Sequence, residues 1–210
     1  MQKIIPAILT ADSEELRKQF SILRGNTNWL HIDIADGTFV KNQSISIFEL
    51  QEAYKYFNLE IHLMVKNPER YFEDCDSMGA KRVIFHYEAV SNITETQEKS
   101  AHYQFHTGIA LNPETKLEVL NSVKERISSL LLMSVHPGFQ GQEFIVSSLE
   151  KAREARKMFP EMLIGIDGGI AKENIKEVFS AGASYAIVGS KIVKAENPVE
   201  ALRELEEMIK

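Results

Sequence analysis

Polar side chains stand near the carboxyl ends of three short apolar segments. His31 and Asp33 are two residues apart in the first segment, and His62 and Met64 are two apart in the second. Asp167 closes the third segment and is followed by two glycines. Because alternate residues of a β-strand point to the same face, each pair shares one face of its strand. Two imidazoles and two carboxylates that converge from such strands could bind a divalent metal through nitrogen and oxygen ligands.

A purely structural role is the alternative for each residue taken singly. An inward His or Asp near a strand end is often a buried polar group that has a hydrogen-bond partner. Two carboxylates buried near one another, however, are costly unless a cation or protons compensate their charge. We therefore predict one divalent metal ion at His31, Asp33, His62 and Asp167, and this ligand set suits Zn²⁺, Fe²⁺, Mn²⁺ or Co²⁺.

Glycines follow three successive apolar segments in the second half of the chain. The loops are Pro137-Gly138-Phe139-Gln140-Gly141, Asp167-Gly168-Gly169 and Gly189-Ser190. Any one of them could simply form a tight turn. Their placement on three successive loops favours a phosphate site, because glycine lets backbone N–H groups approach phosphate oxygens. A P-loop is excluded, since the sequence contains no Gly-x-x-x-x-Gly-Lys-Ser/Thr.

These residues can meet only in a fold that brings the ends of several strands together. The sequence alternates between two kinds of segment, as such a fold requires. Eight β-branched or aliphatic runs are separated by amphipathic stretches. The expected strands are Ile4–Leu9, Trp29–Ile34, Leu59–Met64, Arg82–His86, Gly108–Leu111, Leu130–Val135, Leu163–Ile166 and Tyr185–Val188.

The segments between these runs are expected to be helices. One begins after Asp12 and carries Leu16, Phe20 and Leu23 on one face, and another covers Ser148–Phe159. A last helix begins at Asn197-Pro198, where proline suits the first turn.

Eight β-then-α pairs predict an α/β protein with a parallel sheet and crossover helices. Eight repeats in so short a chain favour closure into a TIM (β/α)₈ barrel over an open doubly wound sheet. No linker or change of composition divides the sequence, so we expect residues 1–210 to form a single domain. In such barrels catalytic groups collect at the carboxyl ends of the strands, where the polar residues above are found.

Composition excludes several classes of protein. The 210 residues include 24 Lys and Arg and 30 Asp and Glu, which gives a formal net charge of −6. That charge, without a long basic run, argues against a nucleic-acid partner. The apolar start is too short for a signal peptide or a membrane span, so we expect no membrane partner. Cys75 is the single cysteine, which favours a reducing cytoplasm, and its acidic neighbours argue against a nucleophilic role.

The motifs together resemble the ribulose-phosphate 3-epimerase family nearly from end to end. The segments that carry the resemblance are Pro6-Ala-Ile-Leu-Thr-Ala-Asp12, His31-Ile-Asp-Ile-Ala-Asp-Gly-Thr-Phe-Val-Lys-Asn42, Glu60-Ile-His-Leu-Met-Val65, Met133-Ser-Val-His-Pro-Gly-Phe-Gln-Gly-Gln142, Ile166-Asp-Gly-Gly169 and Val188-Gly-Ser190. The resemblance implies a TIM barrel that binds a divalent metal and inverts C3 of a ketose phosphate. It also implies a homo-oligomer, since members of the family are often dimers or hexamers.

Position by position, the resemblance assigns roles to the residues already singled out. His31, Asp33, His62 and Asp167 match the metal ligands, and Asp33 and Asp167 match the acid/base pair. The residues that match the substrate and phosphate contacts are Met64, Met133, Gly138, Phe139, Gln140, Gly141, Gly168, Gly169, Gly189 and Ser190. The two methionines could equally be core residues that fill gaps.

The implied reaction agrees with this assignment. Loss of the C3 proton next to a ketone builds negative charge on the C2 oxygen, which a bound metal would stabilise. Inversion then requires proton-transfer groups on both faces of the planar intermediate, and two aspartates from separate strands could supply them. We expect D-ribulose 5-phosphate and D-xylulose 5-phosphate as the substrate pair.

Departures from the family pattern leave the substrate open. Ala7 stands where the family usually has Ser, Ala35 where it has Met, and Gln140 where it has Gly; Lys41 and His136 also depart. The space at the two alanines could suit a hexulose 6-phosphate such as allulose 6-phosphate. A barrel that binds sugar phosphates without catalysis is a further alternative. His86-Tyr-Glu88 ends the fourth strand and could face the pocket, but a hydrogen-bonded structural role is the expectation for His86.

Overall fold

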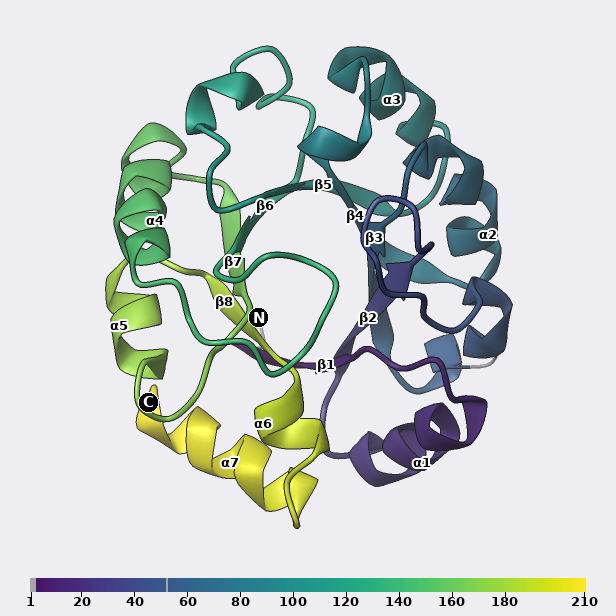
Figure 1. The fold of residues 1–210 in the computed structure, drawn as a ribbon, viewed down its shortest axis with the longest axis vertical. Coiled ribbons are helices and arrows are strands. Elements are labelled where there is room, and N and C mark those ends of the chain that lie inside the picture. Colours follow the sequence, from purple (N-terminus) through teal and green to yellow (C-terminus); the bar gives the residue numbers. More distant parts are fainter. Residues whose placement is uncertain (1–2, 52) are drawn as a thin grey trace.

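Eight parallel strands close into a barrel, which confirms the predicted TIM fold (Figure 1). The computed structural model describes residues 3–51 and 53–210. Met1, Gln2 and Glu52 lie outside the described residues, and the first two of them belong to the expected domain and to its apolar start. The strands are β1 (Ile4–Ile8), β2 (Trp29–Ala35), β3 (Asn58–Met64), β4 (Ala80–His86), β5 (His106–Leu111), β6 (Ser129–Met133), β7 (Leu163–Asp167) and β8 (Tyr185–Val188). Each strand pairs with the next in the sequence, and β8 pairs with β1 to close the barrel.

A ring of helices surrounds the barrel (Figure 1). The α-helices are α1 (Ser13–Leu23), α2 (Phe72–Ser77), α3 (Ile93–Ser100), α4 (Ser147–Met158), α5 (Ile175–Ser180), α6 (Ser190–Val193) and α7 (Pro198–Met208). Short 3₁₀ turns are η1 (Ile47–Leu50), η2 (Ala53–Lys55), η3 (Pro68–Tyr71), η4 (Tyr87–Ala89) and η5 (Leu117–Leu120). The three helices predicted individually are confirmed, and α1 is capped by Asp12, which accepts from the backbone N–H groups of Glu14 and Glu15.

The expectation of an α-helix in every crossover is wrong for two connections. Among the described residues, only 3₁₀ turns follow β2 and β5. The buried apolar residues there recur every three positions, as in Leu117, Leu120 and Val123. That spacing matches the three residues per turn of a 3₁₀ helix and not the 3.6 of an α-helix, so short 3₁₀ turns suffice to bury them.

Alternation along the strands sorts their side chains into two layers. One face of each strand packs against the helices in a continuous apolar core that includes Ile32, Ile61 and Leu132. The other face fills the inside of the barrel. Its apolar members are Ile5, Ala7, Ile84, Ala110, Leu131, Met133, Tyr185 and Ile187, and the loop residue Val135 packs with them. The same alternation gives His31, Asp33, Glu60, His62, Arg82 and His86 the interior positions of β2, β3 and β4.

Cys75 on α2 is fully buried in the helix-facing core. Burial raises the pKa of its thiol far above the usual range, and the charge of Asp74 raises it further. A thiol of this kind carries no nucleophilic role, as the sequence predicts. No helix in the described part of the chain combines the length and the apolar character needed to cross a bilayer.

Candidate active site

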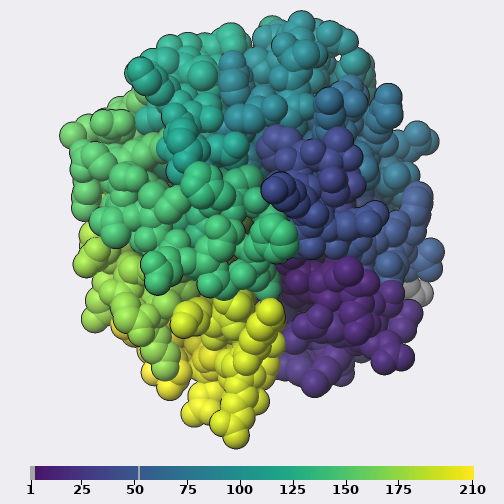
Figure 2. Space-filling view, in the orientation of Figure 1, coloured from purple at the N-terminus to yellow at the C-terminus, as the bar shows by residue number. Residues whose placement is uncertain are grey.

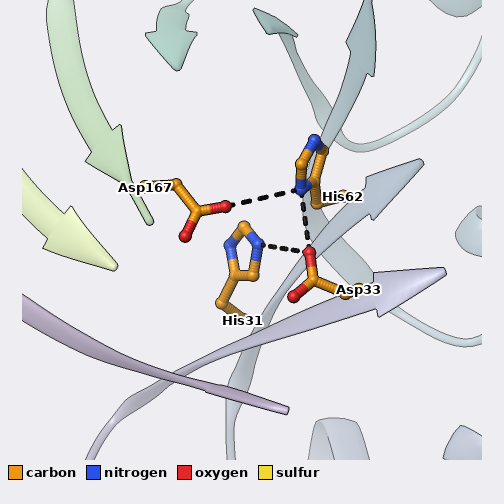
Figure 3. Close-up of side chains that lie close together, drawn as sticks. All are labelled: His31, Asp33, His62 and Asp167. Atoms are coloured by element: carbon orange, nitrogen blue, oxygen red, sulfur yellow. Dashed lines mark hydrogen bonds and ion pairs between the residues drawn. The ribbon is translucent and has the colours of Figure 1, made fainter. Parts of the chain in front are cut away.

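Four polar side chains meet at the carboxyl end of the barrel (Figure 3). His31 and Asp33 come from β2, His62 from β3, and Asp167 from the end of β7. Asp33 and His62 are register partners on adjacent strands. One potential ligand atom from each residue lies within 4.8 Å of the others. The four residues that the sequence predicts as metal ligands are therefore brought together in space.

Asp33 lies at the centre of the cluster. Its Oδ1 atom is 2.9 Å from Nδ1 of His62 and 3.2 Å from Nε2 of His31. Asp167 approaches from the far side, with Oδ2 at 3.8 Å from the same His62 nitrogen. Among the described residues, the ion pairs of the two aspartates involve only these histidines. Two carboxylates and two imidazoles that face one point, without Lys or Arg among them, form a donor set that fits a divalent transition metal.

A further carboxylate, that of Glu60, orients the His31 ring. Its Nδ1 atom lies 2.6 Å from Oε1 of Glu60, whose other oxygen accepts from the Arg82 guanidinium. Since Nδ1 is engaged by Glu60, Nε2 is the nitrogen that faces the cluster. Burial lowers the pKa of His31, but the charges and hydrogen bonds of Asp33 and Glu60 raise it by more, so that the net pKa is well above the usual value.

The two aspartates have pKa values shifted in opposite directions. Burial tends to raise the pKa of Asp33, but His31 and His62 lower it by more, and the result is well below the usual range. Burial and the negative charge of Asp33 raise the pKa of Asp167 to about 6. At neutral pH the Asp33 carboxyl group is ionised, whereas the pKa of the neighbouring Asp167 lies near neutrality. Two carboxyl groups with pKa values shifted apart are typical of acid/base pairs.

A cavity of about 600 Å³ opens above this cluster. Asp33 and Asp167 line it, whereas His31 and His62 are fully buried and do not reach its surface. All residues predicted for substrate or phosphate contact line the same cavity, namely Met64, Met133, Gly138, Phe139, Gln140, Gly141, Gly168, Gly169, Gly189 and Ser190. The segment between β6 and α4 extends across the mouth of the barrel, where its green atoms meet the blue and purple segments (Figure 2).

The loop after β7 requires its glycines. Gly168 and Gly169 have φ of +114° and +61°, which side chains rarely adopt. A Cβ atom on Gly169 would lie 2.6 Å from the backbone nitrogen of Phe144. Asn174 holds the loop in place, because its amide donates to the Gly169 carbonyl at 3.0 Å. The close approach of two loops is thus sufficient to explain these glycines, and contact with a phosphate is a separate proposal.

Two of the departures from the family pattern lie against each other in the cavity. The side-chain amide of Gln140 donates to the carbonyl oxygen of Ala7 at 3.4 Å. The same amide is 2.7 Å from the position of a Cβ atom built on Gly189. Gln140 therefore occupies space next to Ala7. Ala35 packs with Met64 of the neighbouring strand β3 and with Val40 of the loop after β2.

Three residues near the site were not predicted from the sequence. Glu60 and Arg82 are buried beneath His31, and Lys191 lines the cavity directly after Ser190. The signal for Glu60 is its position two residues before His62, which places both side chains on one face of β3. Lys191 carries no such periodic signal.

Comparison with known proteins agrees with this geometry. The sequence model of the "Ribulose-phosphate 3 epimerase family" matches residues 3–193. Ribulose-phosphate 3-epimerase of Bacillus subtilis is 34% identical over 98% of this chain and 98% of its own, and that of Aquifex aeolicus is 35% identical over 100% and 97%. A crystal structure of orotidine 5'-phosphate decarboxylase from Pyrococcus horikoshii shares the fold alone, with a TM-score of 0.72, 15% identity and 98% coverage of both chains. The chain therefore belongs to the ribulose-phosphate 3-epimerase family and is an isomerase.

Proposed function

We propose that the protein interconverts D-ribulose 5-phosphate and D-xylulose 5-phosphate with two proton-transfer groups: one of Asp33 and Asp167 removes the C3 proton from one face, and the other donates a proton to C3 from the opposite face. The observation that carries the proposal is the placement of two carboxyl groups on separate strands of the barrel, β2 and β7, with their side chains turned toward one point (Figure 3). Their pKa values, shifted apart, allow one to hold a proton while the other is ionised.

The cluster is suited to one divalent metal ion, which His31, Asp33, His62 and Asp167 would hold. Such an ion, when bound, would stabilise negative charge on the C2 oxygen of the sugar. The choice among Zn²⁺, Fe²⁺, Mn²⁺ and Co²⁺ depends on supply as well as on ligand type.

Inversion at C3 follows from the positions of the two aspartates. Asp33, as the carboxylate, accepts the C3 proton from one face of the sugar. Asp167, whose pKa is raised to about 6, donates a proton from the other face. In the reverse direction the roles exchange. A single base on one face would return the proton to the side from which it came.

The phosphate group is proposed to bind where the glycine loops line the cavity. The glycines at this rim carry no side chain that would keep a phosphate from their backbone N–H groups; they are Gly138, Gly141, Gly168, Gly169 and Gly189. The Ser190 hydroxyl and the Lys191 ammonium line the same region, and the cation would attract the dianionic phosphate. Met64 and Met133 line the walls beside the aspartates.

A hexulose 6-phosphate is the alternative substrate. It depends on space left by Ala7 and Ala35, which are smaller than the usual residues of the family. The contact between Gln140 and the Ala7 carbonyl reduces that space, and we therefore favour the pentulose.

Proton exchange in D₂O tests the proposal. Purified protein, loaded with a divalent metal, is incubated with D-ribulose 5-phosphate or with D-allulose 6-phosphate, and NMR follows deuterium at C3. We expect inversion with one deuterium at C3, and a kcat/KM for the pentulose at least about 10-fold the value for the hexulose, as differences in pocket contacts typically give. The Asp33→Asn/Asp167→Asn double variant, which lacks both proton-transfer groups, is the control for contaminating epimerase. Preference for the hexulose would support the alternative, and no exchange with either sugar would reject an epimerase.

A further inference from the structure

His86, at the end of β4, is fully buried and takes no part in the proposed proton transfer. It lies between His62 of the cluster and Glu88 on η4. The His62 and His86 rings stack with centroids 5.0 Å apart, and the Phe39 ring also packs against His86, with its centroid at 4.9 Å. His86 is therefore held in a fixed position directly behind one of the proposed metal ligands.

Hydrogen bonds link these side chains in a defined order. The Nδ1 atom of His62 faces Asp33 and Asp167, and its Nε2 atom lies 2.9 Å from Nε2 of His86. Two ring nitrogens at this distance must share one proton. The other nitrogen of His86, Nδ1, lies 3.3 Å from Oε2 of Glu88, a carboxylate that can only accept.

This order determines where the protons lie on each ring. His86 donates Nδ1–H to Glu88, and its Nε2 atom is then the acceptor. His62 must donate Nε2–H to that acceptor, which leaves the lone pair of its Nδ1 atom directed at the cluster. A neutral imidazole with a free lone pair on the inward nitrogen is the form that binds a metal.

Glu88 is itself fixed at the far end. Its Oε1 atom accepts from the backbone N–H of Asn112 at 2.8 Å and from the Thr115 hydroxyl. Both donors belong to the loop after β5, so the chain of hydrogen bonds extends from the cluster to a neighbouring loop. A carboxylate with three donors has no freedom to turn away from His86.

We propose that His86 and Glu88 are positioning residues that fix the tautomer and the orientation of His62, and so set the affinity of the cluster for a divalent metal. The inference rests on the metal site of the proposed function. Partners of this kind behind a ligand histidine typically change metal affinity by about 10- to 100-fold when they are removed.

Titration of the metal-free protein with Co²⁺ tests this role, with calorimetry for Kd and visible absorption for the coordination of the ion. His86→Phe keeps an aromatic ring in the stack but removes the acceptor, so we expect Kd to rise by about 10- to 100-fold and the absorption spectrum to change. His86→Gln offers an amide oxygen to His62 Nε2–H and should restore Kd to within about 5-fold of wild type. Glu88→Gln weakens the far end and should give an intermediate Kd.

A matched control separates positioning from general stability. Ser100→Ala removes a buried hydrogen bond of 2.8 Å to Thr107, which is distant from the cluster. We expect it to lower Tm without any change in the Kd for Co²⁺.

The outcomes distinguish this inference from the metal site itself. Wild-type Kd in both His86→Phe and Glu88→Gln, in a protein that binds Co²⁺, would overturn the positioning role alone. Equal losses in His86→Phe and His86→Gln would also overturn it, because the acceptor would then be irrelevant. If wild-type protein binds no metal, the metal site of the proposed function fails as well. Glu88→Gln decides the matter if His86→Phe does not fold.

Discussion

The inside of the barrel contains two polar regions that differ in how their charges are balanced. In the lower region Glu60 pairs with Arg82, whose guanidinium lies between the Trp29 and Tyr185 rings at 4.9 and 5.0 Å. In the upper region Asp33 and Asp167 face two imidazoles. Both regions are unusual, since barrels of this kind are generally filled with branched apolar residues.

This difference in charge balance indicates different roles for the two regions. The lower carboxylate is neutralised by a permanent cation of the same chain, so the pair is complete without a ligand. The upper carboxylates face imidazoles and no Lys or Arg among the described residues, so a bound divalent cation would complete their charge balance. Changes in the lower region should therefore act mainly on stability, and changes in the upper region mainly on turnover.

Replacement of an upper carboxylate should have the largest effect. Asp33→Asn and Asp167→Asn are each expected to lower kcat by more than about 100-fold, because each removes one proton-transfer group. Steady-state assays with both sugar epimers measure the loss. Thermal unfolding of metal-free Asp167→Asn should show little loss of stability, because the raised pKa of Asp167 means that its ionised form does not stabilise the fold. Activity within a few-fold of wild type in both variants would refute the two-aspartate mechanism.

Removal of the lower cation should affect stability most. Arg82→Met leaves the buried Glu60 carboxylate without its cation, and we expect a loss of about 3–5 kcal/mol in the free energy of unfolding. Urea unfolding measures it. The Glu60→Leu/Arg82→Met double variant serves as the control and should recover part of the loss, because no charge is then left unpaired. A loss below about 1 kcal/mol in Arg82→Met would show that the pair does not support the fold.

Glu88 should make the stability of the fold depend on pH. Burial tends to raise its pKa, but hydrogen bonds from His86 and Thr115 lower it by more, to about 2. A lowered pKa contributes stability above the unfolded value of about 4.5, and that contribution is lost as pH falls toward 2. Metal-free Glu88→Gln should therefore be less stable than wild type by about 1–3 kcal/mol at pH 7, after allowance for partial solvent exposure.

Unfolding of both proteins at pH 7 and at pH 3 checks this sign. The difference between them should shrink at pH 3. At that pH the unfolded wild-type chain binds a proton at Glu88, whereas the folded protein, with a Glu88 pKa of about 2, is still mostly ionised there. A difference that stays constant over this range would contradict the lowered pKa.

The smallest effect is expected at the rim of the cavity. Lys191→Ala removes a cation that lines the cavity, and KM for the sugar phosphate should rise about 3- to 10-fold at low salt, with kcat unchanged. Lys194→Ala is the matched control, since Lys194 is exposed nearby but does not line the cavity. Equal effects of the two variants would show that Lys191 acts only through net charge.

The sequence predicts the strands and the clustered residues well because both depend on alternation. Apolar residues and interior polar residues such as His31 and Asp33 follow the same period of two, which identifies the strand and its inward face together. The crossovers after β2 and β5 are less predictable, because a buried spacing of three is readily taken for one face of an α-helix. The contact between Gln140 and Ala7 joins two loops far apart in the sequence, and no local pattern encodes it.

Exchange at C3 by the two asparagine variants is the most direct test of the central claim, that one aspartate works on each face of the sugar. Each metal-loaded variant is incubated in D₂O with each epimer in turn, and NMR follows the C3 proton. Asp167→Asn should exchange only the epimer whose C3 proton faces Asp33, Asp33→Asn should exchange only the other, and neither should invert it. Exchange of the same epimer by both variants, or of both epimers by either one, would contradict the account.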